Sequence, residues 1–260
     1  MRNATQGITK TRTIGLISAV RLEGSRYIKT LRPVRGATSH LSPPFFSGRL
    51  SGMKTVYAVS GMGKVNAAHA TTLMIERFQP DLIINFGVGG AYPSSGMSTG
   101  DVAIARREIY ADEGIHLKND FLTLEAIGIP LVRSGRKRWF NDFLLENRST
   151  RKILSHSVAA FQKERSYSVK TGDFATVSAC TGTTRRAREI ERRLGVICEN
   201  MEGAAVAHIC AIYGVPMIEI RGISNLVEDR NRDNWDIETA ADHCQQTVEE
   251  AMTLLAETGL

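Results

Sequence analysis

Residues Asp81–Gly90 have the sequence D-L-I-I-N-F-G-V-G-G, in which an apolar run of strand length is followed by a glycine-rich turn. The run predicts a buried strand over Asp81–Phe86 that the glycines stop. Met53–Val59 also predicts a strand; it ends in S-G-M-G-K, and an amphipathic helix over Val65–Phe78 follows it. Strands that alternate with helices predict an α/β fold whose sheet is largely parallel or mixed and is covered on both faces. Ligands of such sheets collect beyond the carboxyl ends of the strands.

The remaining elements follow from the same periodicities. We expect further strands over Thr13–Val20, Asp101–Ala105, Val196–Glu199 and Met217–Ile223, and helices over Arg21–Leu31, Trp139–Phe161, Ala204–Tyr213 and Ala240–Glu257. Residues 32–52 are rich in Pro, Gly, Ser and Arg and predict a loop, and the weak pattern over residues 109–138 predicts substrate-specific loops. Residues 1–12 are polar and basic and predict a flexible N-terminal extension, so residues 13–260 are expected to form a single domain.

Composition and charge limit the classes of function. With 42% hydrophobic residues among 260, the chain can bury a large core, and the formal charge of +6 permits an anionic partner. The densest basic segment, Arg185–Arg193, is interleaved with Glu189 and Glu191, which predicts a solvated helix face. A basic nucleic-acid-binding protein therefore remains an alternative to a protein that binds a small anionic molecule. No apolar run approaches the ~20 residues of a membrane span, and no signal peptide is evident, so we expect a cytoplasmic protein.

The cysteines give no sign of a metal site. Cys180, Cys198, Cys210 and Cys244 show no C-x-x-C spacing, and His208 forms only an isolated H-x-C with Cys210. The spacing predicts buried free thiols, and neither a metal nor an organic cofactor is implied.

Three glycine motifs resemble known signatures without meeting their requirements. Gly96–Gly100 matches G-x-S-x-G, but polar turn residues precede it and a short strand follows it, whereas a nucleophile elbow needs a strand before it and a helix after it. The turns around Gly61–Lys64 and Gly87–Tyr92 lack the full spacing of a P-loop or of G-x-G-x-x-G. We interpret both as tight turns where the backbone approaches a neighbour or a ligand.

Two later segments point to a nucleoside. Glu199–Gly203 is E-N-M-E-G, and Arg221–Asn225 is R-G-I-S-N at the end of an apolar strand, with Trp235 ten residues further on. A carboxylate can bind vicinal ribose hydroxyls while a carboxamide reads a purine edge. This pairing predicts cleavage of an N-glycosidic bond.

From Thr13 to the C-terminus, the chain resembles the nucleoside phosphorylase/nucleosidase superfamily. The resemblance is carried by I-G-L-I-S-A-V with Glu23, by S-G-M-G-K-V-N-A-A from Ser60, by N-F-G-V-G-G-A from Asn85, by T-G-D-F from Thr171 and by the two segments just described. It implies a three-layer αβα architecture with a central mixed, twisted sheet. It also implies a homo-oligomer, most simply a dimer that completes the pocket on the 5′ side of the sugar.

The resemblance also implies roles for individual residues. Glu23 matches the glutamate that activates water in the adenosine-type nucleosidases, and Glu202 matches the glutamate that binds the ribose hydroxyls. Met201 is expected under the ribose, Arg221 beside Glu202 and Trp235 over the ligand. The remaining residues expected to bind substrate are Ser224, Gly89 and Phe174. Asp173 belongs to the T-G-D-F segment. It could be a carboxylate of the catalytic site, but we favour a role as a loop or helix cap.

Asn225 departs from the adenosine-type nucleosidases, which carry an aspartic acid at this position. A carboxamide can donate to O6 of a 6-oxopurine while its carbonyl accepts from a protonated N7, but against a 6-amino group it places two donors face to face. We therefore expect hypoxanthine to be preferred to adenine as the leaving base, with Asn225 stabilising it as Glu23 deprotonates the attacking water.

Water is favoured over phosphate as the nucleophile. The G-D-P-x-R and R-x-G-S phosphate-binding segments of the related phosphorylases are replaced here by S-A-V-R-L-E from Ser18 and by N-F-G-V from Asn85. A nucleosidase of the methylthioadenosine type and a purine nucleoside phosphorylase remain alternatives. For an anionic 5′ substituent, Arg107, Tyr110, Lys118 or a neighbouring subunit could supply the contact.

Overall fold

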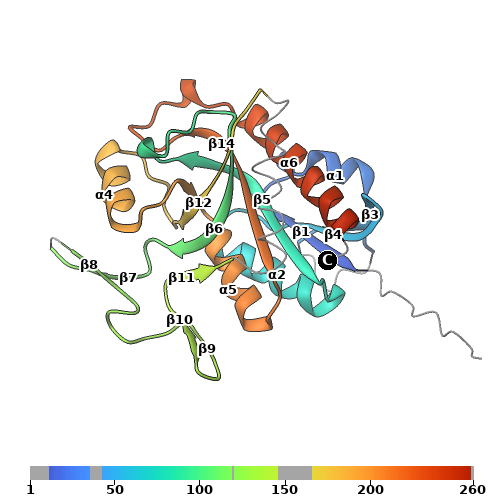
Figure 1. Cartoon of the computed structure of the whole chain (residues 1–260), viewed down its shortest axis with the longest axis horizontal. Coiled ribbons are helices and arrows are strands. Elements are labelled where there is room, and N and C mark those ends of the chain that lie inside the picture. The colour runs from blue at the N-terminus through green and yellow to red at the C-terminus, as the bar shows by residue number, and fades with distance from the viewer. Residues whose placement is uncertain (1–11, 36–42, 119, 146–165, 259–260) are drawn as a thin grey trace, which may run out of the picture.

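The computed structural model describes residues 12–35, 43–118, 120–145 and 166–258, which form a mixed sheet with helices on both faces (Figure 1). The ten strands of this sheet are β1 Thr13–Ser18, β2 Arg32–Pro33, β3 Phe45–Leu50, β4 Met53–Val59, β5 Leu82–Ala91, β6 Val102–Tyr110, β11 Asp142–Leu144, β12 Val169–Thr176, β13 Cys198–Asn200 and β14 Met217–Leu226. The helices are α1 Ser25–Thr30, α2 Lys64–Phe78, α4 Thr184–Leu194, α5 Gly203–Tyr213 and α6 Ile237–Thr258. The predicted α/β class and mixed sheet are confirmed.

Part of the sheet closes on itself. Its main path runs β11-β6-β12-β13-β5-β1-β4-β3-β2, while β14 pairs in parallel with β5 and antiparallel with β6. Since β6 also pairs with β12, β12 with β13 and β13 with β5, strands β5, β14, β6, β12 and β13 form a ring. Closure brings the ends of β5, β13 and β14 together, although these strands are far apart in the sequence.

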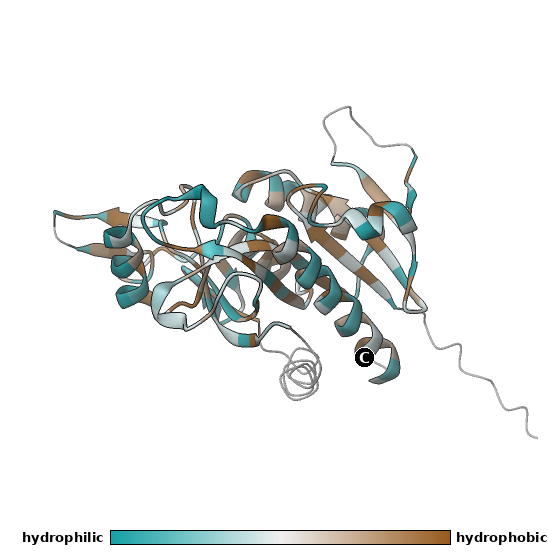
Figure 2. Ribbon diagram, turned by 90° about the horizontal axis from the view of Figure 1, so that it is seen from above, coloured by the Kyte–Doolittle hydropathy of each residue, from teal (hydrophilic) through white to brown (hydrophobic). Residues whose placement is uncertain are grey.

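The core explains why the central strands are continuous apolar runs. Every residue of β1 is buried, and β5 is buried along almost its whole length. Helices α2 and α5 pack against each other, and α6 packs on β14 and β5. Figure 2 shows apolar residues concentrated in the strands and polar residues on the outer sides of the helices. A sheet buried from both faces needs apolar side chains on both, so its strands lose the usual alternation.

Two sequence predictions about secondary structure were wrong. Residues 32–52 contain β2 and β3, and β3 pairs with β4 along six residues, from Phe45 with Ala58 to Leu50 with Met53. Within the predicted helix Trp139–Phe161, the structure has the end of β10 (Lys137–Trp139) and β11, while residues 146–165 lie outside the described residues. The predicted loop region over residues 109–138 holds two small hairpins, β7 Gly114–His116 with β8 Phe121–Thr123 and β9 Val132–Ser134 with β10.

The structure also bears on smaller features of the sequence. Arg185, Arg188 and Arg192 of α4 are exposed, as expected for a solvated face. Strand β6 follows Gly96–Gly100, so this motif is no nucleophile elbow. Three cysteines are buried, but Cys180 is exposed, contrary to the prediction of buried thiols. In the described part of the chain, no helix is long and apolar enough to cross a membrane and no cluster of three metal-binding side chains occurs. The expected extension, residues 1–12, lies outside the described residues except for Arg12.

The packing of α6 on β14 predicts the effect of a substitution at Gly222. A Cβ at this position would lie 1.9 Å from the Ala240 carbonyl oxygen, which is backbone and cannot move aside freely. We expect Gly222→Ala to lower the free energy of unfolding by about 3 kcal/mol or more, measured by urea denaturation. Gly182→Ala, whose Cβ would lie 4.0 Å from its nearest neighbour, should change it by less than about 0.5 kcal/mol. Equal losses in the two variants would contradict this packing.

Candidate active site

Glu23 lies in the turn between β1 and α1 and is held by three backbone N–H groups. Its Oε2 accepts from the amides of Ala19 at 2.9 Å and Val20 at 3.0 Å, and its Oε1 accepts from the amide of Val88 at 2.9 Å. Only 3% of the residue is exposed. Burial raises the pKa of Glu23, although the nearby Arg221 guanidinium and the amide donors oppose the shift. A buried carboxylate with a raised pKa is a stronger base than one in water.

Glu202 lies at the N-terminus of α5 and faces the same region. Its Oε1 accepts from the Gly63 amide at 2.8 Å, and its Oε2 accepts from Arg221 Nη1 at 3.3 Å. Gly63 has a φ of 93°, a left-handed conformation that suits glycine and turns its N–H toward Glu202. The glycine turn after β4 thus approaches a neighbour, as the sequence predicted.

Arg221 joins the two carboxylates through Val88. Its Nη1 donates to the Val88 carbonyl oxygen at 3.2 Å, while the amide of that residue donates to Glu23. Its Nε donates to Glu219 Oε1 at 2.8 Å. Burial disfavours the charge of Arg221, but Glu219, Glu202 and Glu23 outweigh burial and raise its pKa. Arg221 Nη2 is buried without a hydrogen-bond partner among the described residues.

The glycines after β5's apolar run allow this close approach. A Cβ on Gly87 would lie 2.5 Å from Glu23 Oε1 and 3.0 Å from Arg221 Nη1. A Cβ on Gly89 would lie 2.9 Å from the Glu199 carbonyl oxygen. Both positions therefore need glycine for packing, and contact of Gly89 with a substrate stays a prediction.

Asn225 lies beyond a bulge in β14 that reorients its end. Ile223 pairs with Gly89 and Asn225 with Gly90, so Ser224 is the extra residue. The Ser224 hydroxyl lies 2.8 Å from Asn225 Oδ1 and 3.2 Å from the Gly89 carbonyl oxygen. Asn225 Nδ2 donates to the Leu226 carbonyl oxygen at 2.9 Å, and because a carbonyl can only accept, this contact assigns the amide orientation.

Trp235 and Met201 border the same part of the molecule. Trp235 lines a small cavity together with Asn225 and Thr181, and the Arg230 guanidinium lies 4.7 Å above its ring. Met201 precedes Glu202, and its Sδ lies 3.2 Å from Cys180 Sγ. Both residues are half-buried.

The structure thus brings most of the predicted residues together. Glu23, Glu202 and Arg221 form one network, and Ser224 and Gly89 connect it to Asn225. Phe174 is fully buried within a hydrophobic cluster on β12, and its contact with a ligand stays a prediction. The preferred reading of Asp173 as a loop or helix cap was wrong, because it lies within β12 and pairs with Arg107 at 2.5 Å.

The residues suggested for the 5′ side of the sugar are dispersed. Arg107 also pairs with Asp142 at 3.5 Å. Lys118 lines a separate cavity between α4 and the β7–β8 hairpin. The buried Tyr110 lies under Lys64, whose Nζ is 4.9 Å from the ring, so it comes nearest to the Gly63 turn. A role for any of them toward the substrate stays a prediction.

Sequence reasoning missed several residues that hold the site. The amides of Gly63 and Val88 act through the backbone, which no side-chain pattern reveals. Glu199 accepts from Tyr92 Oη at 2.8 Å and from the Thr181 amide at 2.8 Å, and so fixes the loop beside Asn225. Glu219 could have been found from the sequence, because a glutamate inside an apolar strand needs a buried hydrogen-bonding or charged partner.

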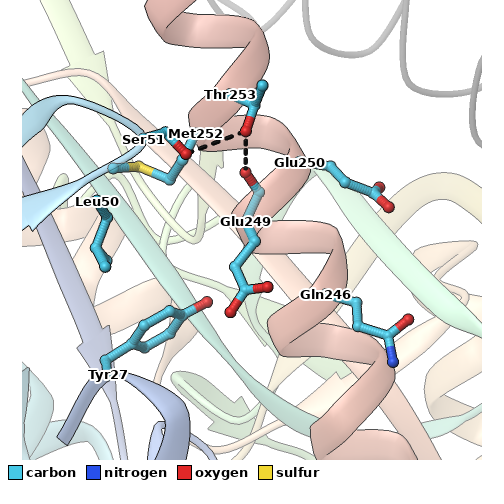
Figure 3. Close-up of a pocket in the computed structure, with 8 residues that line it drawn as sticks. All are labelled: Tyr27, Leu50, Ser51, Gln246, Glu249, Glu250, Met252 and Thr253. Carbon is cyan, nitrogen blue, oxygen red and sulfur yellow. Dashed lines mark hydrogen bonds between the residues drawn. The ribbon is translucent and has the colours of Figure 1, made fainter. Parts of the chain in front are cut away.

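A larger cavity of about 430 Å³ lies elsewhere. Figure 3 shows it between α6 and the turn after β3, where Ser51 Oγ and Thr253 Oγ1 are 3.0 Å apart. Tyr27, Glu249 and Glu250 also line it, and none of the predicted site residues does. This cavity is therefore separate from the predicted site.

Comparison with known proteins places the chain in a family. Residues 13–258 match the model of the phosphorylase superfamily. Futalosine hydrolase of Thermus thermophilus is 32% identical over 230 residues, which cover 85% of this chain and 94% of that protein. The 5′-methylthioadenosine/S-adenosylhomocysteine nucleosidase of Geobacillus thermodenitrificans is 30% identical over 214 residues, which cover 81% of this chain and 84% of that protein.

Solved structures agree with the fold. The nucleosidase of Colwellia psychrerythraea, solved in complex with adenine, superposes with a TM-score of 0.77 at 23% identity, covering 95% of this chain and 96% of that one. The nucleosidase of Neisseria meningitidis gives a TM-score of 0.77 at 24% identity, covering 93% of this chain and 99% of that one. With the family match across nearly the whole chain, these findings show that the protein belongs to the phosphorylase superfamily.

Proposed function

We propose that the protein hydrolyses the N-glycosidic bond of futalosine and releases hypoxanthine and dehypoxanthine futalosine, a step of menaquinone biosynthesis. The observation that carries the choice of base is the amide of Asn225. Its Nδ2 faces the Leu226 carbonyl oxygen and keeps a second hydrogen for O6, while Oδ1, held by Ser224, keeps a lone pair for a protonated N7. The relation to futalosine hydrolase supports the same choice.

The reaction follows from the charges of the site. As the C1′–N9 bond stretches, the sugar gains positive charge, which the buried carboxylates of Glu23 and Glu202 stabilise. Glu202 accepts hydrogen bonds from the 2′ and 3′ hydroxyls, and Arg221 and the Gly63 amide hold it in place for this. Water gives its hydroxyl to C1′ and its proton to Glu23. The base leaves with the electron pair of the C1′–N9 bond and takes a proton from solvent at N7, and Glu23 then releases its proton to solvent, so that one water is consumed overall.

A nucleosidase for 5′-methylthioadenosine is the second candidate. Several relatives of similar identity carry that name, and they cover most of the chain. The same carboxylates would serve either substrate, so the two differ at the residue that binds the base and at the contacts to the 5′ substituent. We also propose that the enzyme is a cytoplasmic homodimer that acts without a metal or an organic cofactor; sedimentation analysis would test the dimer.

Chromatography of the released bases tests the function. The protein is incubated with futalosine, inosine and 5′-methylthioadenosine, each with and without phosphate. We expect hypoxanthine from futalosine at a rate independent of phosphate. Adenine from 5′-methylthioadenosine would favour the second candidate, phosphate-dependent release would indicate a phosphorylase, and salt-dependent duplex binding without any release would indicate the nucleic-acid alternative.

Glu23→Gln tests the proposed base. The amide cannot accept a proton from water, so we expect kcat to fall by about 10²–10⁴-fold. The affinity for substrate, measured by equilibrium binding, should change far less, because Glu202 and Asn225 are untouched. Glu228→Gln removes a charge at the cavity that Asn225 lines and serves as the control. A kcat within twofold of that control would disprove the role of Glu23.

Asn225→Asp tests the choice of base. A protonated aspartic acid donates to N7 and its carbonyl accepts from a 6-amino group, so it suits adenine. We expect the ratio of kcat/KM for 5′-methylthioinosine to that for 5′-methylthioadenosine to fall about 10- to 100-fold, the range of one mismatched buried hydrogen bond. Asn231→Asp makes the same substitution at another residue of that cavity, where Asn231 accepts from the Asp233 amide, and should leave the ratio unchanged.

A further inference from the structure

Two fully buried glutamates lie directly behind the proposed ribose site. Glu108 on β6 and Glu219 on β14 have no exposed surface. A Cβ on Gly203 would lie 2.1 Å from Glu108 Oε1 and 2.8 Å from Glu219 Oε1, so both oxygens border the same point, beside Glu202 in the chain. The mechanism proposed above uses neither carboxyl group.

The partners of Glu219 require it to be an anion. Its Oε1 accepts from Arg221 Nε at 2.8 Å and from Asn85 Nδ2 at 3.0 Å, and its Oε2 accepts from Asn85 Nδ2 at 2.9 Å. Each of these partners can only donate. A proton on Glu219 would therefore face another donor.

Glu108 offers a place for a proton. Its Oε1 faces Asn200 Nδ2 at 2.7 Å, which can only donate, but its Oε2 faces the hydroxyl of Thr176 at 2.7 Å, which can also accept. Thr176 Oγ1 accepts from the Ala204 amide at 2.8 Å and lies 3.1 Å from Asn200 Oδ1. Because a hydroxyl has two lone pairs, it can accept from Glu108 as well and still donate to Asn200. Among the hydrogen bonds of Glu108 and Glu219, the contact between Glu108 Oε2 and the Thr176 hydroxyl is the one that can hold a proton on a carboxyl oxygen.

The surrounding charges favour the same assignment. Glu219 and Arg221 on β14 and Cys198 on β13 face Glu108, together with Tyr110 on its own strand. Thr176 on β12 and Gly203 on α5 also face Glu108, and neither carries a charge. Burial, and next the repulsion by Glu219, raise the pKa of Glu108 well above its usual value. The Arg221 guanidinium lowers the pKa of Glu108, but it also interacts with Glu202 and Glu23.

We propose that Glu108 is a neutral carboxylic acid and that, with anionic Glu219, it forms a positioning pair for Arg221 and Glu202. Glu219 fixes the guanidinium that binds Glu202, while Glu108 fixes Asn200, whose Oδ1 accepts from the Glu202 and Gly203 amides at 3.0 and 2.7 Å. The positioning role rests on the proposed nucleosidase activity, whereas the protonation state does not. When Glu108 ionises as the pH rises, a second negative charge beside Glu219 competes with Glu202 for Arg221, and activity falls.

Glu108→Gln tests both parts, because glutamine imitates the neutral acid. Its carbonyl can accept from Asn200 and its NH2 can donate to Thr176, yet it cannot ionise. We expect the alkaline limb of the pH profile of kcat/KM to move to higher pH in this variant. Glu125→Gln, which changes an exposed glutamate, should leave the limb in place. An unmoved limb in Glu108→Gln would overturn the positioning role.

Stability gives a readout that does not need the reaction. A carboxyl group with a raised pKa in the folded chain contributes fully below its unfolded pKa, and that contribution is lost as pH rises through the folded pKa. We therefore expect the Tm of Glu108→Gln to exceed that of the wild type by an amount that grows with pH and vanishes in acid. Parallel Tm curves would overturn the assignment of the proton.

Infrared spectroscopy of the wild type observes the proton itself. At neutral pH, the difference spectrum between the wild type and Glu108→Gln should contain the C=O stretch of a protonated carboxyl group, and its absence would overturn the proposal even if the variant folded poorly.

Glu219→Gln removes the anion that holds Arg221, and kcat/KM should fall about 10- to 100-fold. If the wild type released no base at all, the proposed function would fail, while the infrared and Tm results would still decide the state of Glu108.

Discussion

The site depends on how the buried guanidinium of Arg221 is shared among carboxylates. Arg221 contacts Glu219 and Glu202 directly and lies near Glu23, and all four residues are almost fully buried. Removing one partner of such a network typically costs 3–5 kcal/mol, because a buried charge is left uncompensated. The position of each carboxylate is therefore coupled to the others. A rigid arrangement of charges is also what stabilises a developing positive charge without reorganisation.

The closed ring of strands explains how these residues meet. Arg221 and Glu219 lie on β14, Glu202 follows β13, and Val88 lies on β5, which pairs with both strands. The bulge at Ser224 then lets adjacent side chains, Ser224 and Asn225, form a hydrogen bond at the strand end. In an unbroken strand, these neighbours would point to opposite faces. The fold thus supplies Arg221 and Glu219 from the interior of β14, and the amide of Asn225 from an irregularity near the end of the same strand.

Much of this could be predicted from the sequence, and the failures have physical causes. Apolar runs located β1, β4, β5 and β14 because burial from both faces leaves a strong composition signal. Strand β3 was missed because it is a half-exposed strand near the sheet edge, with Gly48 and Arg49 in its sequence. The short β10 and β11 depend on pairing partners rather than on local pattern, and β6 runs past Ala105 because it pairs with β11, β12 and β14. The motifs named Glu23, Glu202, Arg221 and Asn225, but the backbone donors of Gly63 and Val88 follow from tertiary approach alone.

The distribution of amides around the network has one electrostatic explanation. Asn85, Asn200 and Asn225 each occupy a place where a hydrogen-bonding side chain is needed and another charge would be costly. Asn85 donates twice to Glu219, and Asn200 donates to Glu108 while accepting from the amides at the start of α5. Carboxylates at these positions would add negative charge to a region where Arg221 already balances several carboxylates. Burial of a further unpaired charge would cost stability. The amide of Asn225, the residue proposed to bind the base, likewise adds no charge beside this network, so the proposed recognition of a 6-oxopurine leaves the charge balance around Arg221 unchanged.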